Sequence, residues 1–272
     1  MNKLKKFKFG ENWNSFSKLI NNEKLKYSVN SLQKLTDMKS FKNMTFLDIG
    51  CGSGLSSLAA INLKCKSLFA IDDDPESVLT TKMVLKNYKK KARVKKLSVF
   101  DLNEKSKFDI VYSWGVLHHT GFMIKAIKKT CKMVNNDGLL IISLYKKTYL
   151  CSLWKVEKFI YNNSPIFIQK IIKNAFIFFF KFGLFLTKKN FNDYVNDYEK
   201  MRGMNFYHDV HDWLGGYPYE SISVKETKSL LESLNFKLIK CFETNRTVGL
   251  LGASCDEYVF KKITNIISKN NI

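Results

Sequence analysis

The chain is poor in arginine, proline and histidine. Its 272 residues include three prolines, four histidines and only three arginines, Arg93, Arg202 and Arg246. A surface that binds phosphates usually uses the planar fork of arginine, so this composition argues against a dedicated nucleic-acid-binding face. The net charge of +21 comes from lysines spread along the whole sequence, which indicates a compositional drift rather than one basic binding surface.

No Cys-x-x-Cys pair occurs among the six cysteines, which lie far apart in the sequence. This spacing predicts reduced thiols and no zinc ribbon. The basic first ten residues lack the apolar stretch of a signal peptide, and the uninterrupted apolar run at residues 175–180 is too short to span a bilayer. We therefore expect a cytoplasmic protein. With 45% apolar residues, the chain can bury a substantial core.

The strongest local signal lies in residues 46–54, Phe-Leu-Asp-Ile-Gly-Cys-Gly-Ser-Gly. Residues 46–49 are expected to form a buried strand, the three alternate glycines a turn, and the small apolar residues 55–62 a helix. Glycine lets the backbone approach a ligand closely, and a helix N-terminus points free N–H groups at it. The stretch therefore predicts a binding site for a polar ligand.

Strand and helix patterns alternate after this stretch. Strands are expected at 66–71, 94–99, 108–114 and 139–145, helices at 75–88 and 124–134, and a turn at 135–138. Later come a helix at 224–234 and strands at 236–244 and 257–261, whose connection is short enough for an antiparallel pair. This order predicts an α/β fold, with a doubly wound Rossmann-like seven-stranded sheet, helices on both faces and an antiparallel last strand.

The pattern also predicts the domain organisation. Residues 1–45 hold amphipathic helices that should pack on the main domain, where Phe9 and Trp13 could help to close the ligand site. Residues 46–145 and 221–265 form the ligand-binding core.

Residues 146–220 contain no clear strand and are expected to form a helical cap inserted into this core. Within them, residues 166–186 are rich in Ile and Phe but interrupted by lysines. A cap over the site is the favoured interpretation. A helix in peripheral contact with a membrane and a dimer surface are the alternatives.

The glycine stretch resembles motif I of class I S-adenosylmethionine-dependent methyltransferases, in which an acidic residue precedes Gly-x-Gly-x-Gly. Here these residues are Asp48, Gly50, Gly52 and Gly54. Asp72 ends the second expected strand, 18 residues after Gly54, where the family carries a ribose-binding carboxylate.

Two further segments carry the resemblance, which covers about residues 46–145 and 224–261. Asp101, beside Phe100, matches an acidic residue that faces the adenine, and residues 108–119 resemble the family's fourth-strand motif. The resemblance implies S-adenosylmethionine as cofactor. The cofactor-binding residues are then Asp48, Gly50, Cys51, Gly52, Gly54, Asp72, Asp73, Phe100, Asp101, Leu102, Ser113, Trp114 and His118.

The chemistry of these residues suits that cofactor, which has a sulfonium, an amino-acid end, a ribose and an adenine but no phosphate. A nicotinamide dehydrogenase is the rival for a glycine-rich loop, but its Gly-x-Gly-x-x-Gly spacing is not met, because Leu55 occupies the last position. Several candidates have structural alternatives. Gly54 could serve helix packing alone, Asp73 could be solvated, Asp109 is expected to be structural, and Cys51 fills a variable slot without chemistry.

All four histidines fall into two short segments, His118-His119 after the fourth strand and His208 and His211 near the end of the insertion. The first should lie at the carboxyl edge of the sheet beside the cofactor, and we expect the second to fold over it. Catalytic candidates are His119, His208, His211, Asp212 and Tyr217. Candidates for the acceptor pocket are Phe9, Trp13, His119, Tyr207, Trp213 and Tyr219.

Residues 202–220, together with residues 9–13, also resemble an uncharacterised bacterial subgroup of methyltransferases. Alternatively, His208 and Asp212 are a pair on a helix surface, four residues apart. A metal site from His208, His211 and Asp212 has no further support, and none is expected.

Two functions follow from these observations. The first is methyl transfer to a small-molecule acceptor through an O, N, S or C nucleophile, with an aromatic or apolar acceptor favoured by the insertion. The alternative is a tRNA or other macromolecule methyltransferase that uses lysines for phosphate contacts. Against it, no basic–aromatic RNA module is recognisable, and residues 113–116 (Ser-Trp-Gly-Val) lack the Asn-Pro-Pro-Tyr-like tetrapeptide of amino-group methylases. Binding without catalysis is a third, disfavoured function.

Overall fold

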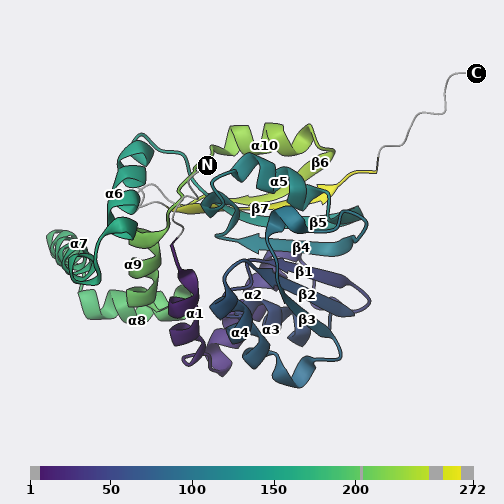
Figure 1. Cartoon of the computed structure of the whole chain (residues 1–272), viewed down its shortest axis with the longest axis horizontal. Coiled ribbons are helices and arrows are strands. Elements are labelled where there is room, and N and C mark those ends of the chain that lie inside the picture. Colours follow the sequence, from purple (N-terminus) through teal and green to yellow (C-terminus); the bar gives the residue numbers. More distant parts are fainter. Residues whose placement is uncertain (1–6, 203–204, 245–253, 265–272) are drawn as a thin grey trace, which may run out of the picture.

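Seven strands form one sheet in the computed structural model, which describes residues 7–202, 205–244 and 254–264 (Figure 1). The strand order is β3-β2-β1-β4-β5-β7-β6. Strands β1 to β5 are parallel, and β7 runs antiparallel to both β5 and β6. The predicted Rossmann-like sheet with an antiparallel last strand is therefore confirmed. The strands are β1 Thr45–Ile49, β2 Ser67–Asp72, β3 Ala92–Lys96, β4 Phe108–Trp114, β5 Val134–Tyr145, β6 Phe236–Phe242 and β7 Cys255–Lys262.

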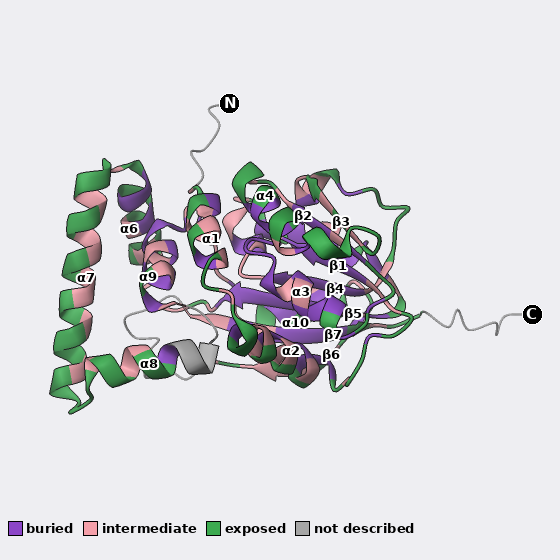
Figure 2. Cartoon of the chain, turned by 90° about the horizontal axis from the view of Figure 1, so that it is seen from below, coloured by how far each residue is buried: buried purple, intermediate pink, exposed green. Residues whose placement is uncertain are grey.

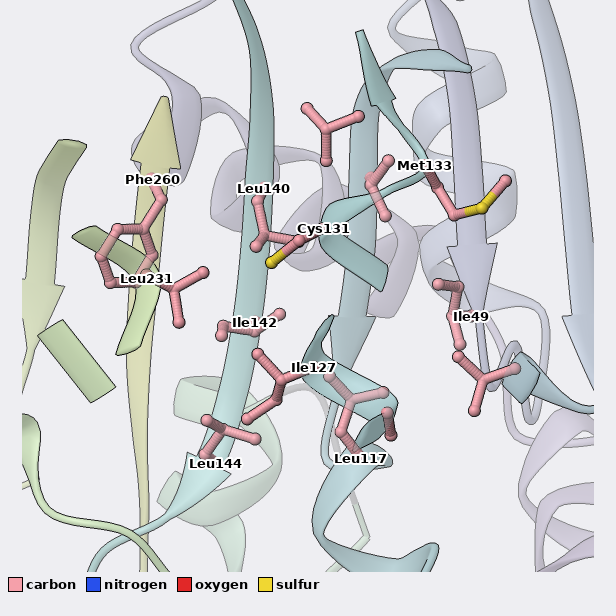
Figure 3. Packing of buried hydrophobic residues seen from close by; sticks show 14 of the residues in the cluster. Ile49, Leu117, Ile127, Cys131, Met133, Leu140, Ile142, Leu144, Leu231 and Phe260 are labelled. Atoms are coloured by element: carbon pink, nitrogen blue, oxygen red, sulfur yellow. The ribbon is translucent and has the colours of Figure 1, made fainter. Parts of the chain in front are cut away.

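Both faces of the sheet are covered by helices. Alternate residues of each central strand point to opposite faces and therefore join two separate apolar clusters. Leu47 and Ile49 of β1 join one apolar cluster with Ile127 of α5 (Met123–Cys131) and Leu231 of α10 (Val224–Glu232), as Figure 3 shows for the three residues it labels. Phe46 joins a second cluster with residues of α2 (Asn22–Thr36) and α3 (Leu55–Asn62). The two clusters fix the register of the sheet and thus the positions of the loops at its carboxyl edge.

Several element boundaries differ from the sequence expectation, among them those of β3 and β5. Strand β3 covers Ala92–Lys96 rather than 94–99, and Val99–Asp101 form a short 3-10 turn, η2, capped by the Ser98 hydroxyl. Because β3 is a partly exposed edge strand, apolar residues do not mark its limits.

The expected turn at 135–138 belongs to β5 instead. The β4–β5 register shifts between Phe108 and Ile110, and Asp137 takes a positive φ of 59°. Residues 135–138, whose composition is typical of a turn, therefore form the irregular first part of strand β5.

The N-terminal helix α1 (Phe9–Ser17) packs on α4 (Pro75–Val84), the helix that follows β2. Asp74 caps α4 by accepting from the backbone N–H groups of Glu76 and Ser77. The Gly10 N–H donates to the same carboxylate at 3.3 Å. Short turns η1 (Lys86–Tyr88) and η3 (Leu117–His119) follow α4 and β4.

Four helices between β5 and α10 stand to one side of the sheet, where Figures 1 and 2 both place them. They are α6 Cys151–Asn163, α7 Ile166–Leu186, α8 Phe191–Arg202 and α9 Phe206–Gly215. An apolar cluster of their own joins them, built around Tyr161, Tyr198, Phe206, Val210 and Leu214.

Helix α7 lies at the outer edge of this group, contains no buried residue and is largely exposed (Figure 2). Phe178, Phe182 and Phe185 are 65%, 52% and 74% exposed. Their spacing places them on one face. Within the part of the chain that the structure describes, no helix is long and apolar enough to cross a membrane. Peripheral membrane contact and a dimer surface both stay predictions for this face.

Replacing Gly10 by alanine should loosen the contact between α1 and α4. A Cβ at this position would lie 2.1 Å from Asp74 Oδ1 and 2.6 Å from Glu76 Cβ, so Gly10→Ala should cost about 1–3 kcal/mol as overpacking. The matched control is Gly183→Ala in α7, where nothing lies within 4 Å of the new Cβ. There the better helix propensity of alanine should stabilise by about 0.5–1 kcal/mol. Urea unfolding of both variants checks the difference, and equal effects would contradict the close contact.

Candidate active site

The turn after β1 is held in place by β2. The backbone N–H groups of Gly50 and Cys51 both donate to the Ile71 carbonyl, at 2.8 and 3.0 Å. Gly50 has a φ of +76°, and a Cβ on it would lie 2.3 Å from Val116. Gly54 has a φ of +79° and would place a Cβ 3.1 Å from the Thr81 backbone. Glycine is therefore required here both by the backbone conformation and by the close approach of two neighbours.

Asp72, at the end of β2, connects this turn with the start of α4. Its Oδ2 accepts from the Gly52 N–H at 3.0 Å and its Oδ1 from the Asp74 N–H at 2.9 Å. Burial raises the pKa of the Asp72 carboxyl to about 6, although these two hydrogen bonds favour its charged form. Each oxygen has a further lone pair for a ligand hydroxyl.

Asp48 lies at the back of the loop and is 2% exposed. The Ser57 hydroxyl of α3 donates to its Oδ2 at 2.6 Å. Burial raises the pKa of Asp48 to about 7, opposed by the Ser57 hydrogen bond and reinforced by the charge of Asp72. The acidic residue that leads the motif thus ties β1 to the helix that the glycine turn begins.

A cavity of about 1590 Å³ opens at the carboxyl edge of the sheet in front of this loop. Its lining includes nine of the expected cofactor residues, namely Asp48, Gly50, Cys51, Gly52, Asp72, Asp73, Phe100, Trp114 and His118. Gly54, Asp101, Leu102 and Ser113 do not line it. Leu102 packs in the core, the Ser113 hydroxyl donates to the Ile49 carbonyl at 3.1 Å, and Asp101 is exposed at the end of η2.

His118 and His119 also lie at this edge, and burial lowers the pKa of both. The Tyr145 N–H donates to His118 Nδ1 at 3.2 Å. His119 lines the cavity, and its Nδ1 donates to the Pro218 carbonyl at 2.9 Å. The Gly216 backbone also hydrogen-bonds to the ring and, like the Pro218 carbonyl, favours its protonated form. The pKa of His119 is lowered to about 4.

The second histidine segment does fold toward the site, but its two histidines do not reach the cavity lining. His208 bonds through Nδ1 to Asn205 at 2.9 Å and through Nε2 to the Ser15 hydroxyl of α1 at 3.1 Å. His211 Nδ1 shares a hydrogen bond of 2.7 Å with the Tyr161 hydroxyl, and burial lowers its pKa to about 4. Both join α9 to neighbouring helices.

Asp212, Trp213 and Tyr217 from the same segment line the cavity, as do Phe9 and Trp13 from α1. Tyr207 is 43% exposed, and Tyr219 packs against Tyr145 beneath the lining. Neither of these two lines the cavity. Among the described residues, no group of three or more His, Cys, Asp or Glu side chains is placed to hold a metal ion.

The Gly215-Gly216 pair permits close packing. A Cβ at Gly215 would lie 2.1 Å from the Phe7 ring, and one at Gly216 would lie 2.6 Å from His119 Cε1. Gly215 is the last residue of α9, and Gly216 follows it as the C-cap. These glycines therefore bring α9 against both the N-terminal segment and the candidate histidine.

The comparisons with known proteins agree with this geometry. Residues 40–198, more than half of the chain, match the family model described as a methyltransferase domain (Methyltransf_31). This chain belongs to that methyltransferase family. The resemblance to class I S-adenosylmethionine-dependent methyltransferases that its loop carries is thereby confirmed.

Individual relatives match only part of the protein. A ubiquinone biosynthesis O-methyltransferase from Pelagibacter ubique is 32% identical over 110 residues, which are 40% of this chain and 45% of the relative. A ribosomal protein L11 methyltransferase from Thermosipho africanus is 29% identical over 100 residues, 37% of each chain. The chain therefore spans less than half the length of these curated relatives.

The fold is also found in solved structures. The crystal structure of magnesium protoporphyrin IX methyltransferase from Synechocystis PCC 6803 with bound SAH has a TM-score of 0.52 at 14% identity. The match covers 86% of this chain and 81% of that one. At this identity the likeness concerns the fold alone.

Other residues in or beside the cavity carry no sequence signal. Lys158 of α6 is 2% exposed, donates to the Trp213 carbonyl, and lies 5.9 and 5.5 Å from the ring centres of Tyr145 and Tyr219. Burial lowers its pKa to about 8. Asp193 and Asp197 of α8 line the cavity. Nothing in the sequence separates Lys158 from the other lysines of the chain, or these carboxylates from ordinary helix-surface acids.

Asp48 should make the stability of the methyltransferase fall as the pH rises. Its pKa is about 7 when folded against an ordinary value of 3.8, so the folded state retains a proton that the unfolded state has lost. The stabilisation is complete below about pH 3.8 and is lost as the pH rises through about 7. Its full size is on the order of 4 kcal/mol.

Asp48→Asn should therefore flatten the dependence of the unfolding free energy on pH between 4 and 8. Asp101→Asn, at an exposed position, is the control and should leave the profile as in the wild type. Urea unfolding at several pH values measures both. An unchanged slope in Asp48→Asn would show that Asp48 is ionised in the folded protein.

Proposed function

We propose that this protein transfers a methyl group from S-adenosylmethionine to a small-molecule acceptor bound in the cavity. The observation that carries the proposal is that one cavity has the glycine loop and Asp72 on one wall and His119, Asp212 and Trp213 on another. A cavity of about 1590 Å³ is large enough for two ligands side by side. Aromatic groups from both the N-terminal helix and α9 line it.

The charges around the loop fit S-adenosylmethionine better than a dinucleotide. Asp72, Asp73, Asp74 and Glu76 line this part of the cavity, beside Asp48, whose pKa of about 7 leaves it partly protonated at neutral pH. Such a set would repel a diphosphate but suits a ligand that carries a sulfonium and an ammonium. Asp72 would accept from the ribose hydroxyls, and Phe100 offers an apolar face to the adenine. When bound, this cofactor supplies a methyl group made electrophilic by the positive sulfur.

His119 is the residue best placed to take a proton from the acceptor. Burial keeps the ring neutral at physiological pH by lowering its pKa to about 4, and a neutral imidazole has one ring nitrogen whose lone pair can act as a base. Hydrogen bonds to the Pro218 and Gly216 backbone hold the ring at the cavity. Packing of Gly216 against the ring holds its orientation. A low pKa makes His119 a weak base, so it fits a nucleophile that loses its proton as the bond to carbon forms.

Methylation of a macromolecule is the alternative. It is supported by the similarity to a ribosomal protein methyltransferase. A screen separates the two. The protein is incubated with methyl-labelled S-adenosylmethionine and cell extract divided by filtration into metabolites and macromolecules. Label in the metabolite fraction is the expected result. Label only in RNA or protein would overturn the small-molecule proposal.

Cofactor binding should depend on Asp72 and not on Asp101. Asp72→Asn should weaken S-adenosylhomocysteine binding at least about tenfold, since charge-assisted hydrogen bonds are lost. Asp101→Asn should change the Kd less than about threefold, because Asp101 is exposed and outside the cavity lining. Isothermal titration calorimetry gives both values. Equal losses would place the adenine nearer to Asp101 than proposed.

His119→Gln should lower turnover about 100-fold or more while S-adenosylhomocysteine affinity stays near wild type, as expected for loss of a general base. His208→Gln is the matched control, because His208 bonds to Asn205 and Ser15 away from the cavity. Turnover is measured with the acceptor found in the screen. If His119→Gln loses cofactor affinity as well, the role of His119 is structural.

A further inference from the structure

The cavity has a charge opposite to that of the protein. The chain carries 45 lysines and arginines against 24 acidic residues. Among the described residues, however, twelve acidic side chains line the cavity and only two cationic ones, Lys8 and Lys189. Half of the acidic residues of a strongly basic protein are thus gathered around one space. A compositional drift toward lysine would instead be expected to place more lysines than acidic residues around the cavity.

The cofactor accounts for only part of this charge. Six acidic residues of the lining lie away from the segments 11 and 48–76, namely Asp193, Asp197, Asp209, Asp212, Glu243 and Glu257. Glu243 is paired with Lys146 at 2.9 Å, and Glu257 accepts from the Trp114 indole N–H at 2.8 Å. The remaining four belong to α8 and α9, the helices beside the sheet.

Of these four residues, Asp212 is the one with a buried carboxylate oxygen that has no partner among the described residues and that lies at the cavity. It is 8% exposed and lines the cavity. Its Oδ1 is buried and accepts no hydrogen bond from the described residues. A buried carboxylate oxygen without a partner is costly unless a donor or a cation reaches it.

The surroundings of Asp212 disfavour its charged form unless a positive charge lies nearby. Burial raises its pKa well above the ordinary value, and the neighbouring Asp209 charge raises it further. Asn12 of α1 and the Lys173 ammonium of α7 favour the charged form but contribute less. Asp209 accepts from the Tyr198 hydroxyl. Among the described residues, the protein's own groups therefore leave Asp212 Oδ1 without a hydrogen-bond partner.

Aromatic rings complete this wall. Tyr194, Tyr198 and Trp213 line the same cavity as the four carboxylates. Aromatic faces attract ammonium groups through their quadrupole, and carboxylates do so by charge. Rings together with the buried, unpartnered Oδ1 of Asp212 favour a cationic nitrogen over a neutral hydroxyl or an anion.

We propose that the methyl acceptor carries an ammonium group, which binds to Asp212 and Asp209 on the α8–α9 wall. This inference rests on the proposed methyltransferase function and specifies its substrate class. The acceptor is an amine-bearing molecule. A neutral hydroxyl could also donate to Asp212, but an ammonium makes the stronger, charge-assisted hydrogen bond, and an acidic molecule is disfavoured by charge repulsion. The lysines on the outside of the protein have no part in this selection.

The test compares amines with alcohols of the same shape. Tyramine and tyrosol, tryptamine and tryptophol, and 1,5-diaminopentane and 1,5-pentanediol are titrated by calorimetry into the full chain saturated with S-adenosylhomocysteine. At least one amine should bind about tenfold or more tightly than its alcohol, as charge-assisted hydrogen bonding to a buried carboxylate requires. If no amine binds more tightly than its alcohol, the inference is wrong.

Variants locate the selectivity. Asp212→Asn should reduce the preference for the amine to less than about threefold. Asp193→Asn combined with Asp197→Asn should reduce it to a lesser degree, and since both side chains are exposed this variant should fold normally. Asp137→Asn, 70% exposed and outside the cavity lining, is the control and should keep the full preference. Full preference in both cavity variants would overturn the assignment to this wall.

The same titrations separate this inference from the function on which it rests. Failure of the wild-type protein to bind S-adenosylhomocysteine overturns the proposed function itself. Normal binding of S-adenosylhomocysteine without selection of an amine leaves that function standing and overturns only the acceptor class.

Discussion

The turn from β1 into α3 is the constraint on which the rest of the site depends. Its three glycines all have positive φ, which glycine adopts without the steric cost that other residues incur, and hydrogen bonds hold the turn in this one conformation. The Ile71 carbonyl supplies two acceptor contacts and the Asp72 carboxylate a third, all from the neighbouring parallel strand. Parallel pairing of β1 with β2 therefore does more than bury apolar surface, because it fixes the shape of the ligand-binding loop.

The opposite wall is assembled by the same means, namely close backbone approach at glycine. Gly10 allows α1 to reach α4, and Gly215 and Gly216 allow α9 to reach Phe7 and His119. Segments from the beginning and from the last third of the chain thus meet over one edge of the sheet. These contacts explain why glycine occurs in two unrelated segments, Phe-Gly-Glu-Asn-Trp at residues 9–13 and Trp-Leu-Gly-Gly-Tyr-Pro at residues 213–218.

The sequence predicted the sheet and the glycine turn between β1 and α3 because both are encoded locally. A strand, its glycine turn and its helix lie within 18 residues of chain at β1 and α3, and buried strands such as β4 are nearly continuous in apolar residues. The edge strand β3 and the irregular start of β5 were misplaced, since tertiary pairing rather than composition sets their limits.

The far wall could not be predicted in the same way, because it depends on how helices rotate when they pack. His208 and Asp212 are four residues apart on α9, which suggested a shared role. In the structure His208 turns to Ser15 on α1, whereas Asp212 lines the cavity. Asp193, Asp197 and Lys158 acquire their positions only from contacts among α6, α8 and α9, and no spacing in the sequence distinguishes them from solvated residues.

Net charge and local charge lead to opposite conclusions about partners, and the local charge is the better guide. A total of +21 suggests anionic partners, yet exposed lysines interact with a ligand through water and salt, where attraction beyond about 10 Å is largely screened. Carboxylates within a partly desolvated cavity act through a lower dielectric and at contact distance, so each contributes more to ligand selection. Burial raises the pKa of Asp48, Asp72 and Asp212, so their charged forms are disfavoured unless a cation lies beside them. A ligand that brings positive charge stabilises these carboxylates, and one that brings negative charge disfavours their charged forms further.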